Sequence, residues 1–196
     1  MTGLINKNRI IIAGLVILMC LLPMVVTKPY YMHVIIMCIL WAYLASCWNI
    51  IGGYAGQLSL GHGIYTAAGA YITMILFNTY GLSPWLGMFI GGGVAVLMSF
   101  IIGFPTFKLR GAYYALATVA IAEAIVVLIN NTGHVGQYVV GGAEGLIVKM
   151  VGNSPAAIQF NSKIPYYYIV LFMLFMIIFI SKWVKESKLG YYLVAL

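Results

Sequence analysis

The residues best suited to handle a polar solute lie in one glycine-rich stretch, Gly52–Gly63. It reads GGYAGQLSLGHG and holds five glycines, no formal charge with His counted neutral, and the polar side chains of Gln57, Ser59 and His62. His62 stands where a short helix is predicted to begin, and the partial positive charge of a helix N-terminus suits a carboxylate. We therefore hypothesise that Gln57, Ser59 and His62 line a solute pathway. The competing interpretation is that they satisfy carbonyls beside a tight turn.

A second candidate is Glu123, which lies well inside the apolar run Ala112–Asn130. A charged side chain at the bilayer centre costs about 2.5–3.5 kcal/mol on insertion scales, so such groups usually face the bundle interior or a pathway. Two interpretations stay open. Glu123 lines or gates the translocation route, or it forms a hydrogen bond with a neighbouring helix.

Other kinds of chemistry find little support. The three histidines are scattered, the three cysteines lie in apolar runs without a CxxC pair, and there is no Asp. Metal binding and intramembrane metal catalysis need clustered ligands or acids, so we expect no metal, no cofactor and no enzymatic activity. The 196 residues contain no GxxxxGK[ST] motif. Energy for transport would therefore come from a partner.

The composition decides which elements position these residues. Of the 196 residues, 64% are hydrophobic and 7% are charged, against about 45–50% and about 25% in soluble domains. This excludes a soluble globule, and disorder is excluded because disordered chains are poor in apolar residues. The net charge of +7 comes from small basic clusters between apolar runs, which is typical of membrane proteins and not of a nucleic-acid-binding surface.

We predict an all-α, polytopic integral membrane helix bundle, a single transmembrane domain over residues 1–196, with about six transmembrane segments. A span needs about 20 residues. Five runs fit: Ile10–Thr27, Tyr30–Ile51, Pro84–Phe104, Ala112–Asn130 and Tyr166–Val184. Ser83 is predicted to cap the third of these. The outer loop would be residues 131–165.

The sixth segment, Gly63–Phe77, has 15 residues and would reach only about 22 Å as a helix. Because it follows the uncharged Gly52–Gly63 stretch, residues 52–77 are predicted to form a broken or re-entrant segment, whose backbone must be covered by protein or a water cavity.

The basic residues orient the chain. With the N-terminus cytoplasmic, six crossings place seven of the ten bases inside. Those inside are Lys7, Arg9, Lys108, Arg110, Lys182, Lys185 and Lys188, and those outside are Lys28, Lys149 and Lys163.

Small residues recur every four positions in the run Pro84–Phe104. They are Gly87, Gly91, Ala95, Ser99 and Gly103. This stripe predicts a helix-packing face, because small residues let helix backbones approach closely.

Three stretches, in order, resemble the permease subunits of branched-chain amino acid ABC importers, and more closely the M type of these subunits. They are Gly52–Gly63 with the AGAY of residues 68–71, Leu109–Glu123 (LRGAYYALATVAIAE) and Val140–Leu146 (VGGAEGL). Val140 stands where the family usually has Thr. The likeness covers most of the chain from Gly52 onward. Relatives that import urea share the same three motifs.

The resemblance implies a transport subunit in the cytoplasmic membrane of a prokaryote. Its partners would be a second permease subunit, cytoplasmic ATP-binding subunits and an extracytoplasmic solute-binding protein, with membrane lipid around it and no nucleic acid. Family members continue past the segment similar to Ser187–Leu196, where a coupling loop begins. We therefore expect a chain truncated before that loop.

Alternatives remain at this point. The chain could be a secondary transporter or channel that works without ATPases, since broken helices and midplane acids occur there too. It could also be an inactive permease fragment. The substrate could be a branched-chain amino acid or a similar small polar solute such as urea.

Overall fold

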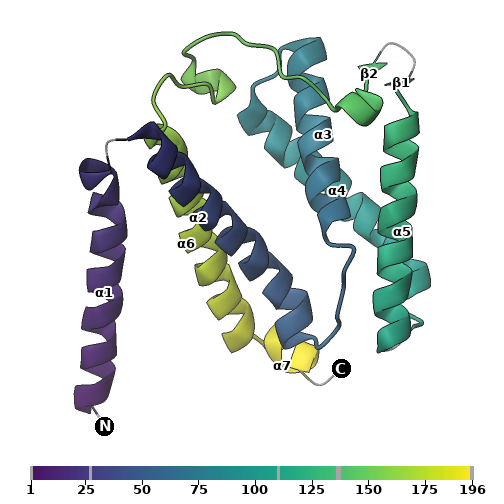
Figure 1. The fold of residues 1–196 in the computed structure, drawn as a ribbon. Coiled ribbons are helices and arrows are strands. Elements are labelled where there is room, and N and C mark those ends of the chain that lie inside the picture. Colours follow the sequence, from purple (N-terminus) through teal and green to yellow (C-terminus); the bar gives the residue numbers. More distant parts are fainter. Residues whose placement is uncertain (1, 27, 110, 136–137, 195–196) are drawn as a thin grey trace. The chain divides into compact units, whose positions relative to one another are not determined.

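Helix dominates the part of the chain that the computed structural model describes, residues 2–26, 28–109, 111–135 and 138–194 (Figure 1). This confirms the expected all-α membrane chain. The helices are α1 (Thr2–Val25), α2 (Pro29–Asn49), α3 (Gly63–Tyr80), α4 (Pro84–Thr106), α5 (Ala112–Asn131), α6 (Ile164–Glu186) and α7 (Lys188–Val194). Thr27, Arg110 and the last two residues, which entered the sequence predictions, lie outside the described residues.

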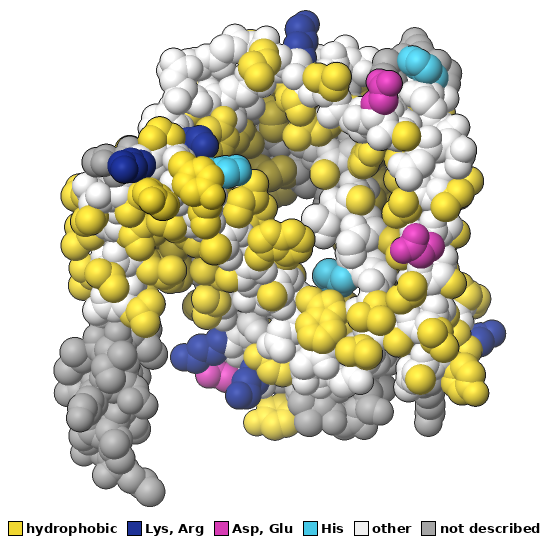
Figure 2. Space-filling view, in the orientation of Figure 1, with side chains coloured by type: hydrophobic (Ala, Val, Ile, Leu, Met, Phe, Trp, Pro, Cys, Tyr) yellow, Lys and Arg dark blue, Asp and Glu magenta, His cyan; other side chains and the backbone are white. Residues whose placement is uncertain are grey.

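Four of the described helical stretches are long and apolar enough to cross a membrane. They are Pro29–Tyr54, Pro84–Thr106, Ala112–Asn131 and Ile164–Glu186. At most 22% of each apolar window is buried inside the chain, so most of this apolar surface needs lipid or another helix against it. Figure 2 shows the same feature, because apolar side chains cover much of the visible surface and charged ones are few.

Helix α3 is longer than its sequence predicts. It runs for 18 residues to Tyr80, about 27 Å, where Phe77 was the expected end. Gly81 ends the helix in a left-handed conformation (φ 65°), and its N–H donates to the Phe77 carbonyl at 3.0 Å. The residues of this last turn are polar, so a prediction based on the length of the apolar run ended the helix at Phe77.

The described chain forms two compact units. The first holds Met1–Cys47 and Ser162–Val184, and the second holds Trp48–Asn161 and Lys185–Leu196. Each is described by itself.

In the first unit, α6 satisfies backbone carbonyls of α1 around a proline. Pro23 lies inside α1 and has no N–H to donate to the Met19 carbonyl four residues earlier. The hydroxyl of Tyr167, a fully buried side chain on α6, donates to that carbonyl at 2.5 Å. The Tyr168 hydroxyl donates to the Cys20 carbonyl at 3.1 Å. A proline is tolerated in a membrane helix when a neighbouring helix supplies such bonds.

In the second unit, α3 and α4 form a close seam through glycines. A Cβ on Gly91 would lie 2.6 Å from the Gly69 carbonyl oxygen, and one on Gly87 would lie 2.8 Å from Thr73 Cγ2. Both distances are shorter than real Cβ contacts. Thr73 adds no unsatisfied polar group, because its hydroxyl donates to the Gly69 carbonyl at 2.8 Å. These glycines therefore allow the two backbones to approach closely.

The other members of the small-residue stripe lie differently. Gly103 is buried, and a Cβ there would lie 2.9 Å from a ring carbon of Phe107 at the end of its own helix. Ala95 and Ser99 are half-buried, and the Ser99 hydroxyl donates to the Val96 carbonyl at 2.7 Å. The structure therefore places Gly87 and Gly91, at the N-terminal end of the stripe, in the seam with α3.

The connection between α5 and α6 is built from short pieces. Strands β1 (His134–Val135) and β2 (Tyr138–Val139) form an antiparallel pair, and 3-10 turns cover Gly142–Glu144 and Pro155–Ala157. Ser83 contacts this connection instead of capping α4 as predicted. Its hydroxyl donates to the Ala156 carbonyl, and it makes no side-chain cap bond.

Candidate functional site

The candidate site is a non-helical segment within the second unit, residues 55–62, which we call the glycine-rich strap. After α2 ends at Asn49, the turn Ile50–Tyr54 has π-helical hydrogen bonding, and regular helix resumes only at Gly63. Gly56 turns the strap with φ 64°, a conformation that a residue with a Cβ rarely adopts. The sequence prediction of an interrupted segment before α3 therefore corresponds to a real break in the helices.

One side of the strap is held by Trp48. The indole Nε1 donates to the Ser59 carbonyl at 2.7 Å across 11 residues. Gly52 makes this possible, because a Cβ there would lie 2.6 Å from the indole ring. A carbonyl that no helix satisfies thus receives its hydrogen bond from a side chain.

The other side of the strap is held by Thr118 on α5. The Leu60 N–H donates to Thr118 Oγ1 at 3.1 Å, and that hydroxyl donates onward to the Ala115 carbonyl at 2.8 Å. A Cβ on Gly61 would lie 2.6 Å from the Thr118 carbonyl oxygen. Gly61 is therefore required for the strap to lie directly against α5.

The sequence-predicted residues of the strap have distinct surroundings. Ser59 is 4% exposed, and its N–H donates to the Gln57 carbonyl at 2.9 Å. Gln57 is half-buried, and its N–H donates to the Ile51 carbonyl at 3.4 Å. These bonds involve the backbone, and they leave the assignment of the Gln57 and Ser59 side chains to a pathway as a proposal.

His62 stands directly before α3 without forming a side-chain cap. Its Nδ1 is buried and has no hydrogen-bond partner among the described residues. Its ring meets the Tyr65 ring edge-on, with the centroids 5.8 Å apart. An unsatisfied ring nitrogen at this position can accept a hydrogen bond from a solute or water, or donate one to it.

Glu123 does not belong to the same cluster. It is exposed on α5, five residues beyond Thr118. At about 100° per residue, it lies about 140° around the helix from Thr118. The structure therefore brings Gln57, Ser59 and His62 into one segment and leaves Glu123 on another face.

Sequence reasoning missed the two side chains that hold the strap. The signal for Trp48 was the Gly52 four residues later, since residues four apart are neighbours on a helical surface. The signal for Thr118 was weaker, a hydroxyl among the alanines of Leu109–Glu123, and threonine is common in membrane helices. Both roles depend on contacts between segments, and single-segment periodicity carries no such information.

The arrangement offers hydrogen-bonding groups and lacks clustered ligands. Among the described residues, there is no group of three or more His, Cys, Asp or Glu side chains that could hold a metal ion. A non-helical backbone at membrane depth is tolerated where protein buries it or where it lines a water-filled cavity. At Ser59 and Gly61, which are buried, the strap meets this requirement through protein contacts.

Comparisons with known proteins give a consistent result. Residues 30–196 match the family model described as branched-chain amino acid transport system, permease component. Two curated proteins, from Escherichia coli (strain K12) and Salmonella typhimurium (strain LT2), are named high-affinity branched-chain amino acid transport system permease protein LivM, and each is 30% identical to this chain over 141 residues. These matches cover 71% of the chain and 32% of each relative, so the chain spans about a third of their length. No solved structure matches.

Proposed function

The chain belongs to the permease family of branched-chain amino acid transport systems, and on this premise we propose that it is a translocating subunit of an ABC importer. It is a multi-pass membrane protein. The proposed substrates are leucine, isoleucine and valine, with a similar small polar solute such as urea as the alternative. The proposed location is the cytoplasmic membrane of a prokaryote, with the N-terminus in the cytoplasm.

The observation that carries the proposal is the glycine-rich strap. It separates α2 from α3 in a mainly helical membrane chain, and side chains from Trp48 and Thr118 hold it in place. Broken helices of this kind form the substrate sites of many transporters, where helix ends and unwound backbone face the solute. We propose that Gln57, Ser59 and His62 line the route at this break and that Glu123 contributes to gating from α5.

The proposed partners follow from membership of the family. A second permease subunit would complete the route, cytoplasmic ATP-binding subunits would supply energy, and an extracytoplasmic solute-binding protein would deliver the solute to residues 131–165. The exposed apolar faces of the helices are compatible with a second membrane subunit, because little of each apolar window is buried within this chain.

The test is uptake of radiolabelled leucine and of urea in cells that co-express the chain with candidate partner subunits. The proposal expects leucine uptake that is lost when the ATP-binding subunit is inactivated. Uptake that persists without the ATPase and collapses with an uncoupler would favour a secondary transporter instead.

Within the same assay, Glu123→Gln tests the gating role. We expect lower uptake at unchanged membrane abundance, because the substitution removes the charge and keeps the size of the side chain. Uptake equal to that of the unsubstituted chain would remove Glu123 from the pathway.

A further inference from the structure

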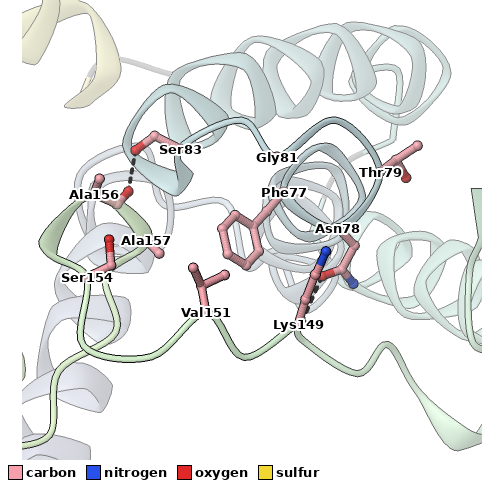
Figure 3. Close-up of a pocket in the computed structure, with 10 residues that line it drawn as sticks. All are labelled: Phe77, Asn78, Thr79, Gly81, Ser83, Lys149, Val151, Ser154, Ala156 and Ala157. Carbon is pink, nitrogen blue, oxygen red and sulfur yellow. Dashed lines mark hydrogen bonds between the residues drawn. The ribbon is translucent and has the colours of Figure 1, made fainter.

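A cavity of about 350 Å³ lies between the α3–α4 turn and the connection that follows β2, within the second unit (Figure 3). Its apolar wall includes Phe77, Val151 and Ala157, of which Phe77 and Ala157 are buried. Ligand sites usually enclose about 300–1,000 Å³, so this cavity has the size for a small solute. It lies away from the glycine-rich strap, at the opposite end of α3.

The wall made by residues 147–151 is held in place on both of its edges. The Asn78 side chain donates to the Ile147 carbonyl at 2.8 Å and accepts from the Lys149 N–H at 3.0 Å. On the other edge, the Gln159 side chain donates to the Lys149 carbonyl and accepts from the Val151 N–H, both at 2.8 Å. The segment is therefore fixed before any ligand arrives, which lowers the entropic cost of binding.

The neighbouring wall is fixed in the same way. The Ser83 hydroxyl donates to the Ala156 carbonyl, and the Trp85 indole donates to the Pro155 carbonyl at 3.0 Å. Both bonds connect the start of α4 to the turn Pro155–Ala157. The cavity is thus formed by side-chain bonds between helices and loop.

Among the described residues that line it, the cavity has one charged side chain that could bind a carboxylate, that of Lys149. Lys149 lies beside the last turn of α3, where its backbone N–H donates to Asn78, so a carboxylate would lie toward this side of the cavity (Figure 3).

We propose that this cavity is a subsite for a free amino acid with an apolar side chain, with Lys149 binding its carboxylate and Phe77, Val151 and Ala157 contacting its apolar group. The proposal deepens the proposed function and rests on it for the choice of an amino acid. It gives the permease a place where solute is held before it reaches the glycine-rich strap.

The test measures binding to the full chain in nanodiscs of zwitterionic lipid by equilibrium dialysis. The probes are leucine, isovalerate, which keeps the carboxylate and the apolar group, and isoamylamine, which lacks the carboxylate. We expect leucine and isovalerate to bind and isoamylamine to bind at least about fivefold more weakly, because a charge-assisted hydrogen bond is lost.

Variants assign the effect to Lys149. Lys149→Gln is expected to weaken leucine binding by about fivefold or more, and Lys149→Arg should retain it within about twofold. The control is Lys163→Gln, another exposed lysine that does not line the cavity. The wall should survive these substitutions, because Lys149 holds it through its backbone N–H and carbonyl.

Several results would overturn the proposal. They are absence of leucine binding to the unsubstituted chain, equal binding by Lys149→Gln, and displacement of leucine by glycerol 3-phosphate at lower concentration than by isovalerate, which would indicate a lipid phosphate site. ATPase-dependent uptake together with any of these would leave the proposed function standing. Lys149-dependent leucine binding without ATPase-dependent uptake would count against the proposed function alone.

Discussion

The α3–α4 seam and the glycine-rich strap both depend on a glycine pressed against a backbone carbonyl. A Cβ on Gly91 would lie 2.6 Å from the Gly69 oxygen in the seam, and one on Gly61 would lie 2.6 Å from the Thr118 oxygen in the strap. In the seam, both partners are regular helices. In the strap, the backbone is irregular, and its polar groups depend on the Trp48 indole and the Thr118 hydroxyl.

This difference indicates what each glycine does for the molecule. A substitution that perturbs the seam separates two whole helices, so it lowers the stability of the second unit. A substitution that perturbs the strap moves a short non-helical segment, so under the proposed function it lowers solute uptake. The same steric conflict should therefore have different consequences in the two regions.

The largest expected effect is in the seam. Gly91→Ala should lower the free energy of unfolding by about 1–3 kcal/mol, because overpacking forces the α3 and α4 backbones apart. Thermal unfolding of the purified chain measures it. Gly92→Ala is the matched control, since a Cβ there meets nothing within 4 Å. Equal stability of the two variants would show that the seam is looser than described.

The strap gives the contrasting result. Gly61→Ala should reduce uptake by the assembled importer about tenfold at nearly unchanged abundance, which corresponds to about 1.4 kcal/mol. The control is Gly63→Ala, where a Cβ has open space. A loss of stability like that of Gly91→Ala, or equal uptake by Gly61→Ala and Gly63→Ala, would remove the distinction between the two regions.

A smaller effect sharpens the role of Thr118. Thr118→Val keeps the shape of the side chain but leaves the Leu60 N–H without its acceptor, at a cost of about 1 kcal/mol. Hydrogen exchange at the Leu60 amide should become faster in this variant. Thr118→Ser keeps the hydroxyl and should restore slow exchange, and a failure to do so would point to packing by the methyl group instead.

The smallest effect tests the same principle outside these regions, at the Pro23 break of α1. Tyr167→Phe should cost about 0.6 kcal/mol and no more than about 1.7 kcal/mol, the average and the maximum measured for hydrogen bonds between membrane helices. In a Pro23→Ala background, the cost should shrink, because the substitution restores a backbone N–H that can donate to the Met19 carbonyl within α1. A double-mutant cycle on unfolding measures this coupling, and additive effects would contradict it.

Much of the helical framework could be predicted from apolar runs, because a helix that crosses lipid must be apolar over its length. The start of α4 at Pro84 and the break before α3 followed from local residue types. The last turn of α3 did not, because Asn78, Thr79 and Tyr80 are polar and the signal at Gly81 is conformational.

The details of the site were harder to predict than the framework. The glycine content of Gly52–Gly63 indicated an irregular segment, and the structure contains one. The bond from Trp48 to Ser59 and that from Leu60 to Thr118 connect residues 11 and 58 positions apart. Such pairings arise from packing of separate segments, which one sequence does not specify. The Asn78 and Gln159 contacts that hold the wall of the cavity beside the α3–α4 turn were missed for the same reason.

The most direct test of the solute route is cysteine labelling in the strap. The free residues Cys20, Cys38 and Cys47 would first be replaced by Ala. Gln57→Cys and Leu97→Cys, the latter on a 63% exposed position of α4, would then be treated with a hydrophilic thiol reagent in the assembled importer. The account predicts that Gln57→Cys reacts, that leucine slows its reaction, and that Leu97→Cys in lipid does not react. An unreactive Gln57→Cys, or labelling that leucine leaves unchanged, would contradict a solute route along the glycine-rich strap.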